Sequence, residues 1–285
     1  MQSGFMFSFF YANELNGSAG IMGIVNLSPD SFYEKSRACS EKEALILAER
    51  QIGEGAAILD IGAESSRPGA TPVSEEIELQ RLVPVISRIC REHKAPVSVD
   101  TYKPAVAEKV LSEGAAIIND ITGLQKYPEM AKIIAKHDAG VVLMHMRGTP
   151  LTMQDKPHYE DLVGEIKNYL KKSIELAEAA GISSAKIMVD PGIGFGKTQA
   201  HNLEILSRLE EFADLGKPLL LGVSRKSFIG GVLGLPEEER LEGALAAAVI
   251  GVLKGARVIR THDVSATCRA VKMTNAIMNF AGKMP

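Results

Sequence analysis

The chain has 285 residues, enough for two ordinary domains or one large barrel. Hydrophobic residues make up 46% of it and charged residues 24%, which excludes general disorder. The net charge of −3 argues against nucleic acid or an anionic membrane as a partner. The three cysteines, at 39, 90 and 268, form no CxxC pair and fit a reducing cytoplasm better than a disulfide framework.

The N-terminal stretch 5–11 is apolar but lacks the basic start and small-residue cleavage site of a signal peptide. We interpret residues 1–19 as a lead-in strand or cap on the core. The longest later apolar run, 244–253, is well short of the roughly 20 residues that a membrane-spanning helix needs. The sequence therefore predicts a protein that is not embedded in a membrane.

Short runs rich in valine and isoleucine recur along the chain and predict parallel strands buried on both faces. The predicted strands are 21–25, 57–61, 96–99, 115–118, 141–144, 187–189, 219–223 and 257–259. Helical patterns separate them. These include a helix after the Ser40–Glu43 capping box, one over 75–91 in which Pro84 marks a kink or an entry segment, and long ones over 159–180 and 237–253.

Polar residues mark the predicted strand ends and recur on average about every 33 residues, the length of a strand with its crossover helix. The markers are Asn26, Asp60, Asp100, Asn119, His145, Asp190, Val223 and Arg260, of which only the valine is apolar. Eight such units predict an α/β fold, a single-domain (β/α)8 TIM barrel over 1–285. An open doubly wound sheet remains the alternative.

In such a barrel the active site forms at the carboxyl ends of the strands, where these markers lie. One acid there could simply cap the next helix, but seven polar residues together favour a concave site that reads the edge of a planar heterocycle. Three loops add cations, at 65–69, 224–227 and 260–263. Guanidinium and imidazole groups beside helix starts are suited to diphosphate.

Two other motifs are weaker. The segment 190–198 contains Gly-Lys-Thr, but Pro191 stands where a P-loop needs glycine, so we reject an NTPase site. The six histidines lack the spacing of a zinc site. A magnesium ion carried in with diphosphate fits better, because it keeps most of its waters and needs only one or two protein oxygens, such as that of Asn26.

Eight segments carry the polar strand-end residues and the cationic loops. The first two are MGIVNLSPDSF at 22–32 and LDIGAESSRPGA at 59–70. The others are 98–101, 118–120, 144–148, 190–196, 224–227 and 260–263. In this order they resemble the signatures of the dihydropteroate synthase family over nearly the whole chain. Eight ordered motifs are far more specific than any one of them.

The resemblance implies a cytoplasmic, homodimeric transferase that condenses 7,8-dihydropterin-6-ylmethyl diphosphate with p-aminobenzoate in folate synthesis. It implies that Asp100, Asn119, Met144, Asp190, Phe195, Gly222 and Lys226 bind the pterin. Asn26, Arg67, Arg260 and His262 would bind the diphosphate, with Asn26 on Mg²⁺, and Phe32, Ser66, Pro68, Lys226 and Ser227 the aminobenzoate. The catalytic residues would be Asp100, Lys226, Arg67, Arg260 and His262.

The implied mechanism is dissociative. Cations and Mg²⁺ stabilise the leaving diphosphate, and the electron-rich pterin, with the Asp100 carboxylate nearby, tolerates the positive charge that develops at its methylene. The aniline nitrogen then attacks. No strong base is needed, which suits a sequence without an evident nucleophile–base pair. The loops at 27–38 and 63–71 would close and exclude water.

The chain departs from the family pattern in its first two loops. Ser28 and Ser66 stand where threonine is usual, and 33–37 replaces a glycine-rich turn with bulkier and charged residues. Losing those glycines stiffens the loop, so we hypothesise altered sulfonamide binding. Inhibition constants equal to those of a relative with the glycine-rich loop would contradict this.

Three other functions remain open. A methyltetrahydrofolate methyltransferase would use similar Asp and Asn positions but would leave Arg67, Arg260 and His262 unexplained. An aldolase-type barrel could use Lys226 as a Schiff-base amine, which borohydride trapping would reveal. A catalytically silent pterin-binding module would bind the pterin without turnover.

Overall fold

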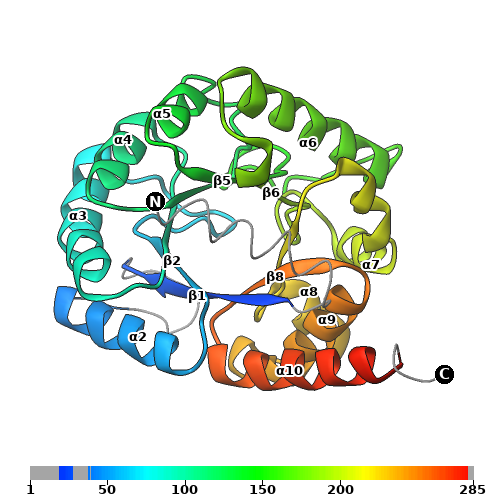
Figure 1. The fold of residues 1–285 in the computed structure, drawn as a ribbon. Helices are drawn as coiled ribbons and strands as arrows, with labels where there is room; N and C mark the ends of the chain where they lie inside the picture. The colour runs from blue at the N-terminus through cyan, green and yellow to red at the C-terminus, as the bar shows by residue number, and fades with distance from the viewer. Residues whose placement is uncertain (1–18, 28–37, 39, 282–285) are drawn as a thin grey trace.

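The computed structural model describes residues 19–27, 38 and 40–281. Its centre is a closed barrel of parallel strands in chain order, with β8 pairing with β1 (Figure 1). The strands are β1 (Gly20–Asn26), β2 (Ile58–Gly62), β3 (Val97–Asp100), β4 (Ile117–Asp120), β5 (Gly140–Met144), β6 (Ile187–Asp190), β7 (Leu219–Gly222) and β8 (Ala256–Thr261). This closure confirms the predicted (β/α)8 barrel and excludes the open sheet.

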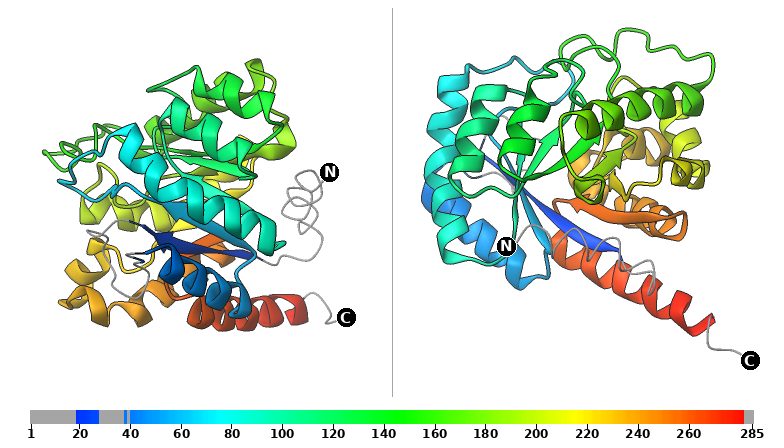
Figure 2. Two further views of the ribbon diagram at one scale, coloured as in Figure 1. Left: turned by 90° about the vertical axis from the view of Figure 1, so that its left-hand side faces the viewer. Right: turned by 45° about the horizontal axis from the view of Figure 1, so that its top comes forward.

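Helices follow the strands and surround the barrel (Figures 1 and 2). They are α2 (Glu41–Gly53), α3 (Glu75–Glu92), α4 (Pro104–Ser112), α5 (Met130–Lys136), α6 (Leu162–Ala179), α7 (Gln199–Ser207), α8 (Ser227–Leu233), α9 (Leu241–Leu253) and α10 (Val264–Ala281). The described residues also form the 3₁₀ helices η3 (Ser184–Lys186), η4 (Leu209–Leu215) and η5 (Glu237–Glu239). Within the described residues, no helix has the length and apolar character needed to cross a membrane.

Local signals placed the ends of the strands within two residues, whereas the helix predicted over 237–253 is divided into η5 and α9. Ser40 caps α2, its side chain accepting a hydrogen bond from the Glu43 backbone at 3.2 Å. Helix α6 starts after Asp161, because this carboxylate caps the helix through the Gly164 amide at 3.1 Å; the sequence pattern began it too early. Pro84 lies inside the continuous helix α3, so the interpretation that it marks an entry segment before the helix is wrong. The predicted lead-in at 1–19 lies almost wholly outside the described residues.

The barrel interior is layered. A fully buried apolar layer is formed by Met22, Ile58, Ile117, Val142, Met188, Leu220 and Val258. Side chains two positions apart in a strand point to the same face. The next inward positions toward the carboxyl ends are therefore Ile24, Asp60, Asn119, Met144, Asp190, Gly222 and Arg260, joined by Ser98 and Asp100 of β3. The interior thus changes within two residues from an apolar floor to a largely polar layer, in which β1, β5 and β7 contribute Ile24, Met144 and Gly222.

Candidate active site

Arg260 lies at the centre of the polar layer. Its Nε donates to Asp60 Oδ2 at 2.6 Å, and its Nη2 donates to Asp100 Oδ2 at 2.9 Å. Asp60, which is fully buried, also accepts from Ser98 Oγ at 2.6 Å and from Asn119 Nδ2 at 3.1 Å. Strands β2, β3, β4 and β8 therefore meet in one network. The network places Asp100 and Asn119, two of the predicted pterin residues, beside Arg260, one of the predicted diphosphate residues.

The charges in this network are unequal, since two carboxylates share one guanidinium. Burial raises the pKa of Asp100 to about 7; Arg260 opposes this effect and Asp60 adds to it. Burial alone would lower the pKa of Arg260, but Asp60 and Asp100 outweigh it and the pKa is raised. Arg260 thus stays cationic, while Asp100 is poised to gain or lose a proton near neutral pH.

Asp190 ends β6, and Lys226 lies directly before α8 in the turn that follows β7. Asp190 Oδ1 accepts from the Gly192 backbone at 2.7 Å. Burial lowers the pKa of Lys226 to about 8, and the charge of Asp190 opposes this effect. The Lys226 ammonium lies 4.7 Å from the centre of the Phe195 ring and donates to the Ile193 carbonyl. A carboxylate, an ammonium and an aromatic face are thereby brought together.

Met144 and Gly222 complete the slot. Met144 pairs in register with Asp190, and it belongs to an apolar cluster against which Phe195 packs. Gly222 pairs in register with Arg260, and its missing side chain leaves space beside the Lys226 ammonium, which would lie 3.8 Å from an added Cβ. The structure therefore brings the predicted pterin residues together at the mouth of the barrel.

The loop after β6 is fastened to β5. Gly192 has a φ of +70°, and an added Cβ there would overlap the His145 carbonyl oxygen, so only glycine fits. Lys197, the lysine of the Gly-Lys-Thr motif, is 2% exposed. Its Nζ donates to the Phe195 carbonyl at 2.9 Å and lies 2.9 Å from His145 Nδ1, and burial lowers the pKa of Lys197 well below its ordinary value. Lys197 is therefore held by groups inside the protein. A P-loop lysine would instead reach out to a bound phosphate.

His262 follows β8 at the rim. Its Nδ1 lies 3.0 Å from Ser224 Oγ, which also accepts from the His262 backbone at 3.2 Å. Burial lowers the pKa of His262 to about 3, and four neighbouring cations lower it further: Arg260, Arg225, Lys226 and Arg67. The imidazole is therefore neutral near pH 7. In the free protein it can donate or accept a hydrogen bond, and the positive charge of the segment 260–263 lies on Arg260.

Arg225 is not part of the anion site, and the expectation that it joins Lys226 there is wrong. Its Nε and Nη2 donate to Asp263 at 2.8 and 2.9 Å, and its Nη1 donates to the carbonyls of Glu237 and Glu238. The residue has a left-handed backbone, with φ +54°. Consecutive cations of one motif thus have different tasks: Arg225 fixes the loop, and Lys226 reaches the site.

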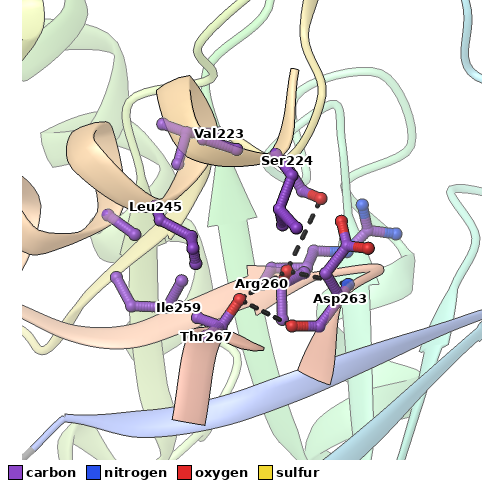
Figure 3. Close-up of a pocket in the computed structure, with 11 residues that line it drawn as sticks. Val223, Ser224, Leu245, Ile259, Arg260, Asp263 and Thr267 are labelled. Atoms are coloured by element: carbon purple, nitrogen blue, oxygen red, sulfur yellow. Dashed lines mark hydrogen bonds between the residues drawn. The ribbon is translucent and has the colours of Figure 1, made fainter. Parts of the chain in front are cut away.

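A small pocket lies behind this rim (Figure 3). Ser224, Arg260, Asp263 and Thr267 line it, and Thr267 Oγ1 lies 3.0 Å from Thr261 Oγ1. Its volume of about 10 Å³ is at the lower limit for a single water molecule. It is too small for a substrate, and its hydrogen bonds serve to fix the loop that carries His262.

A buried ion cluster closes the neck of the β2–α3 loop, residues 63–74. Glu64 Oε2 accepts from the Val73 backbone at 2.9 Å and from Lys103 Nζ at 2.6 Å, and Glu64 Oε1 accepts from Tyr102 Oη at 2.8 Å. Lys103 Nζ also donates to the Val73 carbonyl at 2.7 Å and to Glu78 Oε2 at 2.6 Å. We call these residues the Glu64 clasp. It joins both ends of the loop.

The loop between these ends carries three predicted site residues, Ser66, Arg67 and Pro68. Ser66 and Arg67 are half-buried, and Pro68 is exposed. At the tip, the Gly69 backbone donates to the Pro150 carbonyl at 2.9 Å. The β2–α3 loop is thus tied at its neck by the clasp and at its tip by a hydrogen bond to the loop after β5. These two ties fix the position of the backbone that carries Arg67.

The remaining predicted residues are placed less closely. Asn26 ends β1 at the same edge of the barrel, and Ser227 is exposed at the start of α8, directly after Lys226. Phe32 and the atypical segment 33–37 lie outside the described residues, so the aminobenzoate contact and the sulfonamide hypothesis stay predictions.

Sequence reasoning missed several residues that organise the site. Asp60 served only as a strand marker, and Ser98 received no role, although strand alternation places it on the same face as Asp100. Glu64 and Lys103 gave no signal, because they are 39 positions apart and meet only in the folded chain.

Comparisons with known proteins agree with this geometry. Residues 22–262 match the family described as pterin binding enzyme. The chain is 45% identical to the dihydropteroate synthase of Bacillus subtilis over 262 residues, which cover 92% of this chain and 90% of the relative. It is 44% identical to that of Escherichia coli over 259 residues, covering 91% and 92%.

Solved structures are similarly close. A Yersinia pestis dihydropteroate synthase with a sulfonamide drug has a TM-score of 0.88 and 41% identity, covering 93% of this chain and 96% of that one. A Xanthomonas albilineans dihydropteroate synthase with 4-aminobenzoic acid has a TM-score of 0.85 and 40% identity, covering 94% of each. The chain therefore belongs to the pterin-binding enzyme family, among the dihydropteroate synthases, and is a transferase of folate biosynthesis.

Proposed function

We propose that this chain condenses 7,8-dihydropterin-6-ylmethyl diphosphate with p-aminobenzoate to give dihydropteroate and diphosphate. One observation carries the proposal: Arg260 bridges Asp60 and Asp100, and Asn119 donates to the same Asp60. Groups that can read a heterocycle edge therefore lie beside a fixed cation that can bind a diphosphate. The methyltransferase alternative has no diphosphate for this cation.

The pterin would lie in the slot between the polar layer and Phe195. Asn119 and Asp190 offer an amide and a carboxylate to its donors and acceptors, and Lys226 offers an ammonium. Met144 and Phe195 supply the apolar faces. Burial keeps water from competing for these hydrogen bonds, which makes them stronger than at the surface.

The diphosphate would lie toward the rim, against Arg67, Arg260 and His262. The two carboxylates account for two of the five N–H donors of Arg260, so the guanidinium can also donate to phosphate oxygens. In the reaction the bond between the pterin methylene carbon and the diphosphate oxygen breaks, and its electron pair leaves with the oxygen. The Asp100 carboxylate favours the positive charge that then develops on the pterin.

Mg²⁺ is proposed as an ion that arrives with the diphosphate. In the described part of the chain, no three His, Cys, Asp or Glu side chains form a group that could hold a metal. Asn26 would contribute one amide oxygen and the diphosphate further oxygens, with water as the remaining ligands, which suits an ion that keeps several waters. Bound there, Mg²⁺ would neutralise part of the diphosphate charge.

The amino nitrogen of p-aminobenzoate then forms the new C–N bond and releases one proton. Ser66 and Pro68 on the β2–α3 loop, Ser227 at the start of α8, and Phe32 would position the ring, with Lys226 between the two substrates. The β2–α3 loop, held in place by the Glu64 clasp, would limit the access of water to the pterin cation. Water would otherwise hydrolyse this cation.

Diphosphate release on mixing both substrates with Mg²⁺ tests the proposal, with each substrate and Mg²⁺ omitted in turn. Release that requires all three components, with formation of dihydropteroate, is the expected result. Pterin binding without release would instead support a silent pterin-binding module. Release without aminobenzoate incorporation would indicate hydrolysis of the pterin diphosphate.

We also propose that the chain forms a homodimer through α9 and α10, which pack side by side (Figures 1 and 2). Both helices expose large apolar side chains: Ile250 and Leu253 on α9, and Met273, Ile277 and Phe280 on α10. Exposed apolar groups that gather on neighbouring helices are typical of an interface between subunits. A cytoplasmic location is proposed with it, supported by the free thiols of Cys90 and Cys268.

A further inference from the structure

A second cavity lies at the mouth of the barrel, beyond the ends of β3, β4 and β5. Its volume is about 210 Å³, and its walls include Tyr102, Ile121, Met146 and Tyr169. An apolar cavity of roughly 150 Å³ suffices for benzene. This one can therefore hold a substituted aromatic ring. It borders the apolar cluster that contains Met144 but uses none of the residues proposed to bind either substrate.

Lys126 supplies the positive charge of this cavity. Its ammonium lies 4.1 Å from the centre of the Tyr102 ring and 5.2 Å from that of Tyr127, and these two rings are stacked with their centres 6.4 Å apart. In the described ranges, no carboxylate lies within ion-pair distance of this ammonium. A cation held over aromatic faces at the edge of an apolar cavity is placed to meet an anion.

The other polar groups of the walls already have partners. Tyr102 Oη donates to Glu64 at 2.8 Å, Tyr169 Oη donates to the Thr122 carbonyl, and Thr122 Oγ1 donates to Asp120 at 2.7 Å. The cavity therefore offers rings, methyl groups and one ammonium. We propose that it is a second ligand site, which takes a small planar aromatic carboxylate with its ring against Tyr102 and Met146 and its carboxylate on Lys126.

This site touches both ties of the β2–α3 loop. Tyr102 is the residue that donates to Glu64 of the clasp, and Pro150, which also lines the cavity, accepts the hydrogen bond from Gly69 at the loop tip. An occupant packed against both residues restrains both ties at once. Occupation is thereby coupled to the mobility of the loop that carries Arg67.

Benzoate is the probe, with its binding followed by titration calorimetry and ligand-observed NMR. Saturable binding is expected, at least tenfold weaker in Lys126→Met and unchanged in Lys132→Met, an exposed lysine of the following helix α5. Thr149→Phe, which fills the cavity from its rim, should also weaken binding. No saturable binding to the wild-type chain, or equal binding by Lys126→Met and the wild type, overturns the proposal.

A further variant separates this site from the proposed aminobenzoate site. Benzoate should still bind to Lys226→Ala, because Lys226 is not part of the cavity; binding lost in Lys226→Ala and kept in Lys126→Met places benzoate in the substrate site and overturns the proposal. The diphosphate-release assay is independent of this outcome, so either proposal can fail alone.

Hydrogen exchange tests the coupling. Benzoate should slow exchange of the backbone amides of residues 65–72 at least threefold in the wild-type chain and have no such effect in Lys126→Met. Unchanged exchange at saturating benzoate overturns the coupling between the cavity and the loop.

Discussion

Asp60 and Arg260 are 200 positions apart in the chain, yet their side chains meet at 2.6 Å inside the barrel. Asp60 is fully buried, and it binds the cation that faces the proposed diphosphate site. The pair thus has two consequences: it ties the first quarter of the barrel to its last strand, and it fixes the direction of the guanidinium before substrate arrives. Electrostatic catalysis depends on such prior orientation.

Arg260→Ala is expected to lower turnover at least tenfold, about 1.4 kcal/mol of transition-state stabilisation. It should also lower the free energy of unfolding by about 3–5 kcal/mol, because Asp60 loses its cation while still buried. Steady-state kinetics and denaturant titration measure the two effects. Arg208→Ala is the control, since its partners Glu204 and Glu211 are exposed and the cost should be small. Wild-type rates in Arg260→Ala would remove this residue from the mechanism.

The pH dependence of kcat/KM follows from two shifted pKa values. Asp100, with a pKa of about 7, acts as a carboxylate, so kcat/KM should fall as the pH drops below that value and Asp100 takes up a proton. Lys226, with a pKa of about 8, acts as an ammonium, so kcat/KM should fall again as the pH rises above 8. Lys226→Arg should extend activity on the alkaline side. A wild-type profile that stays level on the acid side contradicts the role of Asp100.

Gly192 offers a test of the β6 loop with a matched control. Gly216→Ala introduces a side chain at φ +63° where no atom lies within 4 Å, so it should cost only the left-handed backbone penalty of about 1–2 kcal/mol. Gly192→Ala adds an overlap with the His145 carbonyl, which should cost about 1–3 kcal/mol more. It should also raise KM for the pterin diphosphate. Equal unfolding free energies for both variants would show that the loop yields freely.

The fold could be predicted from sequence because its signals are local. Short apolar runs, caps and a strand-to-strand spacing of about 33 residues are each visible within one unit of the barrel. The gathering of polar strand-end residues at one mouth of the barrel could be predicted for the same reason: a polar residue two positions beyond a buried strand residue stays on the inner face, as Asn119 does after Ile117.

The rest depends on contacts between distant segments. Arg225 and Lys226 are adjacent in one cationic motif, and only the position of Asp263 and the left-handed backbone decide that Arg225 fixes the loop while its neighbour reaches the site. A histidine in water is partly protonated near neutral pH; burial, together with neighbouring cations, lowers the pKa of His262 and keeps it neutral. Neither effect can be read from a motif, because each arises when the barrel closes.

The Glu64 clasp predicts that a change at the neck of the β2–α3 loop weakens binding of the pterin diphosphate. Glu64→Gln keeps the shape of the side chain but leaves Lys103 with a single carboxylate, Glu78, so the β2–α3 loop should loosen. KM for the pterin diphosphate should rise at least fivefold, because Arg67 is no longer held in one position. This rise corresponds to about 1 kcal/mol of binding free energy. Glu92→Gln, which removes an exposed partner of Arg88, is the control and should change neither KM nor stability measurably. An unchanged KM in Glu64→Gln would show that the clasp does not position Arg67 for binding.

The proposed dimer surface predicts the effect of one charge. Ile277 is 60% exposed and Phe280 68% exposed on α10, so Ile277→Asp should leave the fold intact but oppose association. Light scattering is expected to give twice the 30.6 kDa chain mass for the wild type and a single chain mass for the variant. Leu151→Asp is the matched control, because Leu151 is 63% exposed in the loop after β5 and should leave the dimer unchanged. If Ile277→Asp keeps the doubled mass and the circular dichroism of the wild type, the subunits associate through another face.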